Sequence, residues 1–171
     1  FRMPVQWVNR PNPEFRGFSG LIVSGAVSKG DPIRVEPSGR TTTIARIVTR
    51  DGDLPTAVAG QSVTLTLDDE IDCARGDVIS AATDAPQVAD QFDCEIVWMS
   101  ETPLMPGRPY WLKIGARTVS AQISDIRHRV DPDSLQPLAA RQLNLNDIGR
   151  CTLSLDRAIP FDPYADNPDM G

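Results

Sequence analysis

Residues 15–35 have the sequence FRGFSGLIVSGAVSKGDPIRV, and this segment determines the expected fold class. Glycines at positions 17, 20, 25 and 30 separate short segments rich in β-branched residues. Glycine inside a strand marks a bulge, a bend or a close approach of another backbone, so this spacing favours strands that bend and close on themselves. Lys29-Gly30-Asp31-Pro32 has the composition of a turn between two strands.

The remaining sequence also consists of short runs rich in Val, Ile, Leu and Thr, separated by Gly, Pro and Asp. We expect an all-β protein, because short strands at this spacing favour closed sheets over βαβ units. One short segment, Leu138–Leu145, is the exception and has the pattern of a helical turn. The other expected strands are Met3–Asn9, Gly20–Val27, Ile33–Glu36, Thr42–Thr49, Ser62–Leu67, Val78–Ala81, Phe92–Met99, Tyr110–Ile114, Thr118–Ile126 and Arg150–Leu155.

The small, polar segment Ala82–Asp90 contains Pro86 and predicts a domain boundary. We therefore expect two small closed β-barrels, one formed by residues 1–86 and one by residues 87–171. Pro160–Gly171 has the composition of a loop.

Charge and composition exclude several classes of function. The net charge of -6 argues against nucleic acid as the main partner, because nucleic-acid binders replace counterions with a positive surface. No apolar run approaches the ~18 residues of a membrane helix, so no membrane partner is expected.

Three distant cysteines, Cys73, Cys94 and Cys151, fit reduced cytoplasmic thiols better than a disulfide framework. Phe1 in place of an initiating Met indicates a segment of a longer protein.

The sequence contains no motif of a catalytic or cofactor-binding site. The two lysines, Lys29 and Lys113, fit neither a phosphate-binding P-loop nor an Asn-Lys-x-Asp guanine-binding element. His128 lies between two arginines, so a strand-end histidine is favoured over a catalytic base. The acidic run from Asp68 to Asp72 is either a solvated turn or an oxygen-ligand site for Mg²⁺ or Ca²⁺, and the turn is favoured. We expect no catalytic, cofactor-binding or metal-binding residues.

Arginines gather around two loops. Arg10 and Arg16 flank a proline-rich loop, and Arg40, Arg46 and Arg50 lie around a second turn. The planar guanidinium binds carboxylates through paired hydrogen bonds. These residues either form salt bridges between adjacent loops or dock another domain. Arg10, Arg16, Arg50 and Asp53 are therefore the candidate contact residues.

An ordered set of segments resembles a known family. Met3–Asn12, Phe15–Gly20 and Ser24-Gly25 resemble the start of the second domain in the GTPase subunit of bacterial sulfate adenylyltransferase and in its fusion with adenylylsulfate kinase. The resemblance continues almost to the end of the chain. The segments that carry it are Arg46–Thr49, Asp51–Leu54, Ala59–Val63, Asp69–Asp72, Arg75–Asp77, Leu145–Gly149 and Phe161–Tyr164 with Asn167.

This family is similar to translation elongation factor Tu. The resemblance implies two barrels of the domain II and domain III type, preceded in the parent protein by a GTPase domain. It also implies a non-catalytic, cytoplasmic module that couples the GTPase domain to a separate catalytic subunit, which makes adenylyl sulfate from ATP and sulfate. GTP, ATP and Mg²⁺ would act in the parent protein and not in this segment. Where an adenylylsulfate kinase domain is fused, it would follow the second barrel.

Two expectations follow from comparison with the family. Family members usually continue past Gly171 into one more short hydrophobic strand, so we expect the second barrel to lack a closing strand. The alternative function is an RNA-binding barrel pair from a translation-factor GTPase, which the acidic charge and the scarcity of lysine disfavour.

Overall fold

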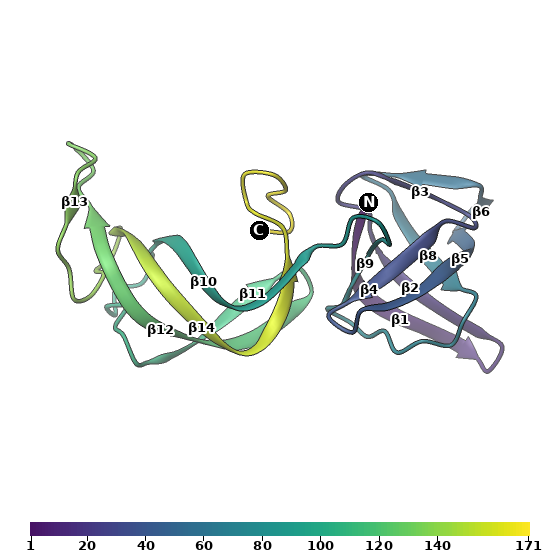
Figure 1. Ribbon diagram of the computed structural model, residues 1–171, viewed down its shortest axis with the longest axis horizontal. Helices are drawn as coiled ribbons and strands as arrows, with labels where there is room; N and C mark the ends of the chain where they lie inside the picture. Colours follow the sequence, from purple (N-terminus) through teal and green to yellow (C-terminus); the bar gives the residue numbers. More distant parts are fainter. The chain divides into compact units, whose positions relative to one another are not determined.

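The computed structural model describes residues 1–171 and consists of β-strands joined by turns, without a helix (Figure 1). The contacts divide the chain into two compact units. Unit 1 contains Phe1–Val88, Lys113–Thr118 and Ile159–Gly171, and unit 2 contains Ala89–Leu112 and Val119–Ala158. The all-β fold class is confirmed.

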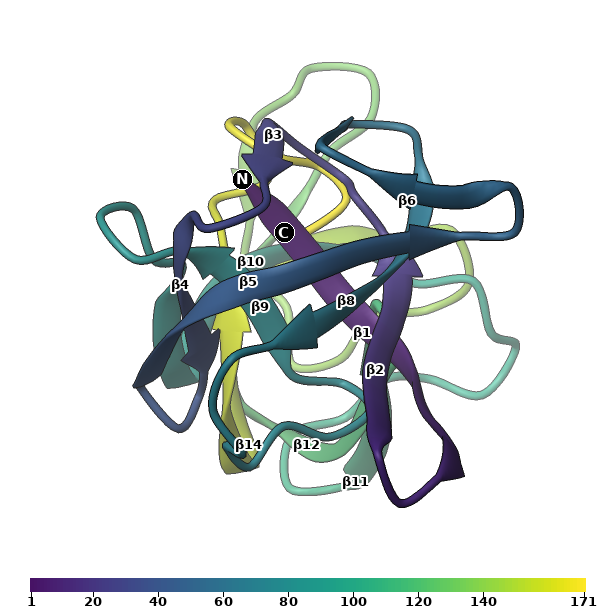
Figure 2. The same ribbon diagram turned by 90° about the vertical axis from the view of Figure 1, so that its right-hand side faces the viewer.

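Nine strands form the first unit's sheets. They are β1 (Arg2–Asn12), β2 (Phe15–Leu21), β3 (Ala26–Ser28), β4 (Pro32–Glu36), β5 (Arg40–Thr49), β6 (Gly52–Leu54), β7 (Thr56–Val58), β8 (Ser62–Leu67) and β9 (Val78–Ala81). The larger sheet has the order β4-β9-β1-β2-β8-β5-β6, and β4 also pairs with β5 (Figure 2). These pairings give β4, β9, β1, β2 and β8 two neighbours each, and β5 three. β3 and β7 form a separate antiparallel pair.

Alternation of side chains builds the core of the first unit. In β8, Val63 and Leu65 are buried while Ser62 is exposed. In β5, Ile44 and Ile47 point into the same core. β8 buries alternate residues, and a register shift between Ile44 and Arg46 lets β5 bury both Ile44 and Ile47, so the apolar side chains of the two strands meet on one side of the sheet.

Gly20 allows β1 and β2 to approach closely. A Cβ built at Gly20 would collide with the carbonyl oxygen of Pro4 and lie 3.0 Å from Cγ of Met3. Gly20 pairs with Val5, and the register of the two strands shifts between Val5 and Trp7. The glycine predicted to mark close backbone contact therefore does so.

The segment Ile159–Gly171 is tied to the first strand of the same unit. Arg2, whose side chain is 8% exposed, donates to Asp162 through Nε at 2.9 Å and through Nη2 at 3.1 Å. Asn167 also donates to Asp162, at 3.1 Å. Met170 is buried. This buried, hydrogen-bonded ion pair holds the segment in place.

Five further strands form the second sheet, and most of their residues belong to the second unit. They are β10 (Gln87–Val97), β11 (Pro109–Ile114), β12 (Arg117–Val130), β13 (Pro137–Leu138) and β14 (Ile148–Phe161). The sheet has the order β10-β14-β12-β11, and β13 pairs with β12. β12 and β14 run antiparallel side by side (Figure 1). The pairing path ends at β10 and β11.

Two local expectations were wrong. Gly20–Val27 is not one strand, because β2 ends at Leu21 and β3 begins at Ala26, with Gly25 at a φ of +71° between them. Leu138–Leu145 forms no helical turn; β13 ends at Leu138, and Leu143 forms a β-bridge with Leu104. In the second segment, pairing of Leu143 with Leu104 overrides the local preference for a helical turn. No helix of the structure has the length and apolarity to span a membrane.

Candidate docking surface

A pocket of about 260 Å³ opens on the surface of the first unit. We call it the β2–β8 pocket, because the start of β2, the end of β8 and the loops next to them form most of its lining. The lining residues are 13–16, 18, 46 and 66–71. Aromatic rings, arginines and carboxylates thus share one concave surface. The size suits one or two side chains of a partner, since sites for small molecules generally begin at about 300 Å³.

Arg16 contributes the unpaired cation of this pocket. It lies in β2 and is half-buried, with its guanidinium carbon 5.3 Å from the centroid of the Phe18 ring. This cation–π contact orients the side chain and occupies none of the guanidinium hydrogen-bond donors. Arg16 is therefore prepared to bind a carboxylate or carbonyl of a partner.

Arg46 and Asp53 form a second charged element at the pocket. Arg46 donates to Asp53 through Nε at 2.7 Å and Nη2 at 3.0 Å, in the bidentate geometry of strong guanidinium–carboxylate pairs. The hydrogen bond from Arg46 lowers the pKa of Asp53 below its usual value, so this carboxyl stays ionised. The pair connects β5 to β6 at the rim of the pocket.

The structure brings three of the four predicted contact residues to this surface. Arg16 lines the pocket, Arg10 forms a 3.7 Å ion pair with the lining residue Glu70, and Asp53 binds the lining residue Arg46. Arg50 is exposed at the turn between β5 and β6 and does not line the pocket. Their role in docking stays a prediction.

Arg46 was predicted to lie at the second turn, but it was not among the four candidate contact residues. Its partnership with Asp53 depends on the β5–β6 hairpin, in which Val48 pairs with Asp53. The available signal was the spacing of Arg46 and Asp53 on either side of a turn at Asp51-Gly52, which places oppositely charged residues on neighbouring strands.

The acidic run beside the pocket has structural partners. Asp69 accepts a hydrogen bond at 2.8 Å from the hydroxyl of Thr42, and Asp68 accepts one from Thr43. These bonds anchor the end of β8 to β5. No group of three or more His, Cys, Asp or Glu side chains is arranged to hold a metal ion.

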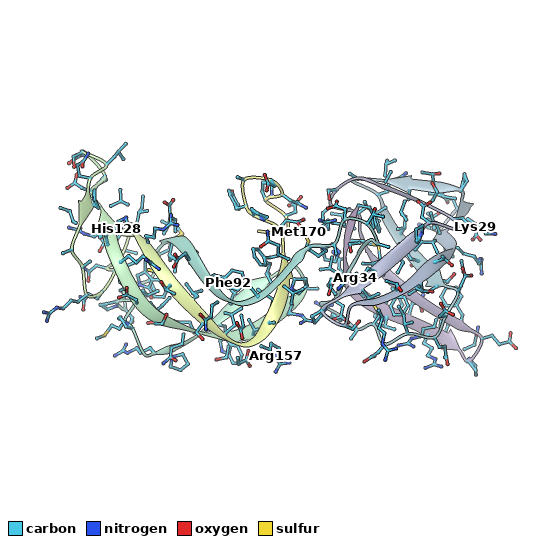
Figure 3. All side chains as sticks on the ribbon, viewed as in Figure 1. Lys29, Arg34, Phe92, His128, Arg157 and Met170 are labelled. Atoms are coloured by element: carbon cyan, nitrogen blue, oxygen red, sulfur yellow. The ribbon has the colours of Figure 1, made fainter.

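The residues considered for nucleotide binding or catalysis do not line this pocket, and Figure 3 labels two of them, Lys29 and His128. Lys29 follows β3 at the predicted turn, and Lys113 belongs to β11. His128 lies in β12, opposite Arg150 of β14. None of these residues lines the pocket.

The amino-acid sequence of this chain is similar to that of curated proteins across its full length. Sulfate adenylyltransferase subunit 1 from Methylorubrum extorquens is 55% identical over 172 residues, which cover 100% of this chain and 36% of the relative. This chain is homologous to part of sulfate adenylyltransferase subunit 1. The bifunctional enzyme CysN/CysC from Xylella fastidiosa is 52% identical over 169 residues, covering 99% of the chain and 27% of that relative. The family resemblance seen in the sequence is confirmed.

Two further comparisons concern the fold. Residues 91–171 match the family described as GTP-eEF1A C-terminal domain-like. The structure of Sup35 complexed with GDP superposes with a TM-score of 0.90 at 16% identity, over 100% of this chain and 42% of Sup35. Elongation factor SelB from Methanococcus maripaludis gives a TM-score of 0.76 at 18% identity, over 95% of this chain and 36% of SelB. These likenesses show an elongation-factor-like fold for this chain.

Proposed function

We propose that this chain is a non-catalytic β-barrel module of a GTP-hydrolysing subunit of sulfate adenylyltransferase. The parent enzyme would form adenylyl sulfate from ATP and sulfate in sulfate assimilation. The observation that carries this proposal is the 55% identity to sulfate adenylyltransferase subunit 1 across the whole chain. GTP, ATP and Mg²⁺ would bind other parts of the assembly, and the module would act in the cytoplasm.

The module would work by position. Arg10, Arg16, Arg50 and Asp53 would contact the GTPase domain of the parent chain, so that a nucleotide-dependent change there reorients the module against the catalytic subunit. Two features support this role. Arg16 and Arg50 keep free guanidinium donors at the surface, and the Arg46–Asp53 pair fixes the rim beside them.

A rigid scaffold suits such a role. In the first unit, the strand pairings from β4 through β9, β1, β2 and β8 to β5 return to β4, which supports a closed barrel. We propose that the second sheet also acts as a barrel and that one more strand between β10 and β11 completes it. Each barrel would then move as one body, because every central strand is held on both sides.

The direct test uses the purified chain and a separately expressed GTPase domain of the parent protein. Calorimetric titration should detect binding of the GTPase domain and no binding of GTP to the chain alone. The double variant Arg16→Ala/Arg50→Ala should weaken domain binding at least about tenfold, as expected for lost charged interface contacts. Arg40→Ala, at an exposed position of the same unit, is the control. Micromolar binding of GTP to the chain would refute the proposal.

The same chain allows a test of the RNA alternative. A filter-binding series in rising salt would show a steep loss of affinity if the barrels contact an RNA backbone. We expect no salt-dependent RNA retention, because the chain carries a net charge of -6.

A further inference from the structure

Two free cysteines occupy neighbouring strands of the second unit. Cys94 lies in β10 and is half-buried, whereas Cys151 lies in β14 and is fully buried. β10 and β14 are adjacent in the sheet. Neither thiol belongs to the proposed docking surface, so their arrangement requires its own explanation.

Side-chain contacts on either side of the cysteines determine how β10 and β14 are aligned. The hydroxyl of Thr152 donates to Asp93 at 2.9 Å, and Arg150 lies 3.8 Å from Glu95. Residue numbers thus rise along β10 while they fall along β14, as in an antiparallel pair. The residues between these two contacts are the two cysteines, which therefore lie directly opposite each other.

Directly opposite residues of an antiparallel pair project from the same face of the sheet, with Cβ atoms about 4.5–5.5 Å apart. A disulfide needs a Cβ separation of about 3.5–4.5 Å, so a small local movement suffices. The Cys94 thiol already points toward β14, because its Sγ donates to the carbonyl oxygen of Cys151 at 3.7 Å.

We propose that Cys94 and Cys151 are a dithiol site that a low-molecular-weight disulfide, such as oxidised glutathione, converts to a cross-strand disulfide. The half-buried Cys94 thiolate attacks one glutathione sulfur, forms a mixed disulfide and releases one glutathione thiolate. Cys151 then attacks the sulfur of Cys94 and releases the second glutathione. Two cysteine thiols become one disulfide, oxidised glutathione becomes two reduced glutathiones, and the two cysteine protons pass to the released thiolates.

The surroundings of the pair set its reaction rate. Burial raises the pKa of Cys94 to about 11, while the Asp93 and Cys151 charges raise it further and Arg150 opposes them. Burial and Asp125 of β12 also raise the pKa of Cys151. Only a small fraction of each thiol is ionised at neutral pH. Oxidation should therefore be slow at pH 7 and accelerate about tenfold per pH unit up to about pH 10, because the thiolate is the nucleophile.

The experiment incubates the full chain with oxidised glutathione at pH 9, quenches with acid, alkylates free thiols and measures intact mass. We expect two of the three cysteines to be protected from alkylation, with no glutathione retained and full recovery of the thiols on reduction. Peptide mapping should link Cys94 to Cys151. Hydrogen exchange should slow in β10, because the new bond ties this terminal strand to β14.

Three variants make the test specific. Cys73→Ser should leave disulfide formation unchanged, since Cys73 belongs to the first unit. Cys94→Ser should abolish it. Cys151→Ala should stop the reaction at a glutathione adduct on Cys94, and this adduct also shows that Cys94 is accessible. Three alkylated cysteines in the wild-type chain after treatment would overturn the proposal, as would a persistent glutathione adduct in place of the internal link.

Discussion

At the scale of single residues, Arg2–Asp162 is the most deeply buried ion pair of the first unit. Both side chains are almost fully buried, at 8% and 12% exposure, and they form two hydrogen bonds. Asp84 also contacts Arg2 but is 70% exposed, so it compensates only in part for loss of the buried partner. Removing one member of such a pair leaves an uncompensated buried charge.

We therefore expect Asp162→Asn to lower the free energy of unfolding by about 3 kcal/mol, at the lower end for a broken buried ion pair because Asp84 remains. The measurement is urea denaturation followed by fluorescence. Asp166→Asn, at an exposed position of the same loop, is the matched control and should leave the midpoint unchanged. Equal midpoints for the two variants would show that the Arg2–Asp162 contact contributes nothing.

The pair Arg46–Asp53 makes a prediction about pH. Because Arg46 lowers the pKa of Asp53, ionised Asp53 stabilises the fold above its unfolded pKa of about 3.9, and this contribution is lost as the pH falls through the lower folded value. Arg46→Ala should raise the pKa of Asp53 toward its usual value in an NMR titration of the carboxyl carbons. Arg40→Ala should not change it. An unshifted Asp53 in the Arg46 variant would contradict the observed pairing.

At the scale of elements, Gly20 determines how closely β1 and β2 pack. A methyl group at this position would collide with the backbone carbonyl of Pro4, which cannot rotate away as a flexible side chain would. We expect Gly20→Ala to destabilise the first unit by about 1–3 kcal/mol, the range for overpacking. Thermal unfolding measures the effect, with Ser62→Ala on the exposed face of β8 as control. A variant as stable as the wild type would mean that β1 can shift without cost.

The elements also show what sequence can and cannot supply. Ser62–Leu67 and Val78–Ala81 could be predicted with their bounds, because clear turn residues flank short β-branched runs. The break between β2 and β3 could not, since it depends on long-range bonds such as the one from the amide of Ile22 to the carbonyl of Gln61. Arg16 could be predicted as a contact residue from its place beside a proline-rich loop. The pairing of Arg46 with Asp53 could not, because it depends on the register of the β5–β6 hairpin.

At the scale of the whole molecule, the chain combines two all-β units with a charged surface pocket on the first unit. Its homology to sulfate adenylyltransferase subunit 1 covers the full chain but 36% of that relative. The central proposal is therefore that this module transmits a nucleotide state generated elsewhere in the parent protein. Loss of its docking residues should uncouple the assembly without removing its chemistry.

The most direct measurement is the stimulation of adenylyl sulfate formation by GTP in the assembled parent enzyme carrying Arg16→Ala and Arg50→Ala. We predict that GTP stimulation falls at least about tenfold, in line with loss of interface charges, while activity without GTP stays at the wild-type level. The Arg40→Ala enzyme should keep full stimulation. Full stimulation in the double variant would contradict the coupling role of this surface.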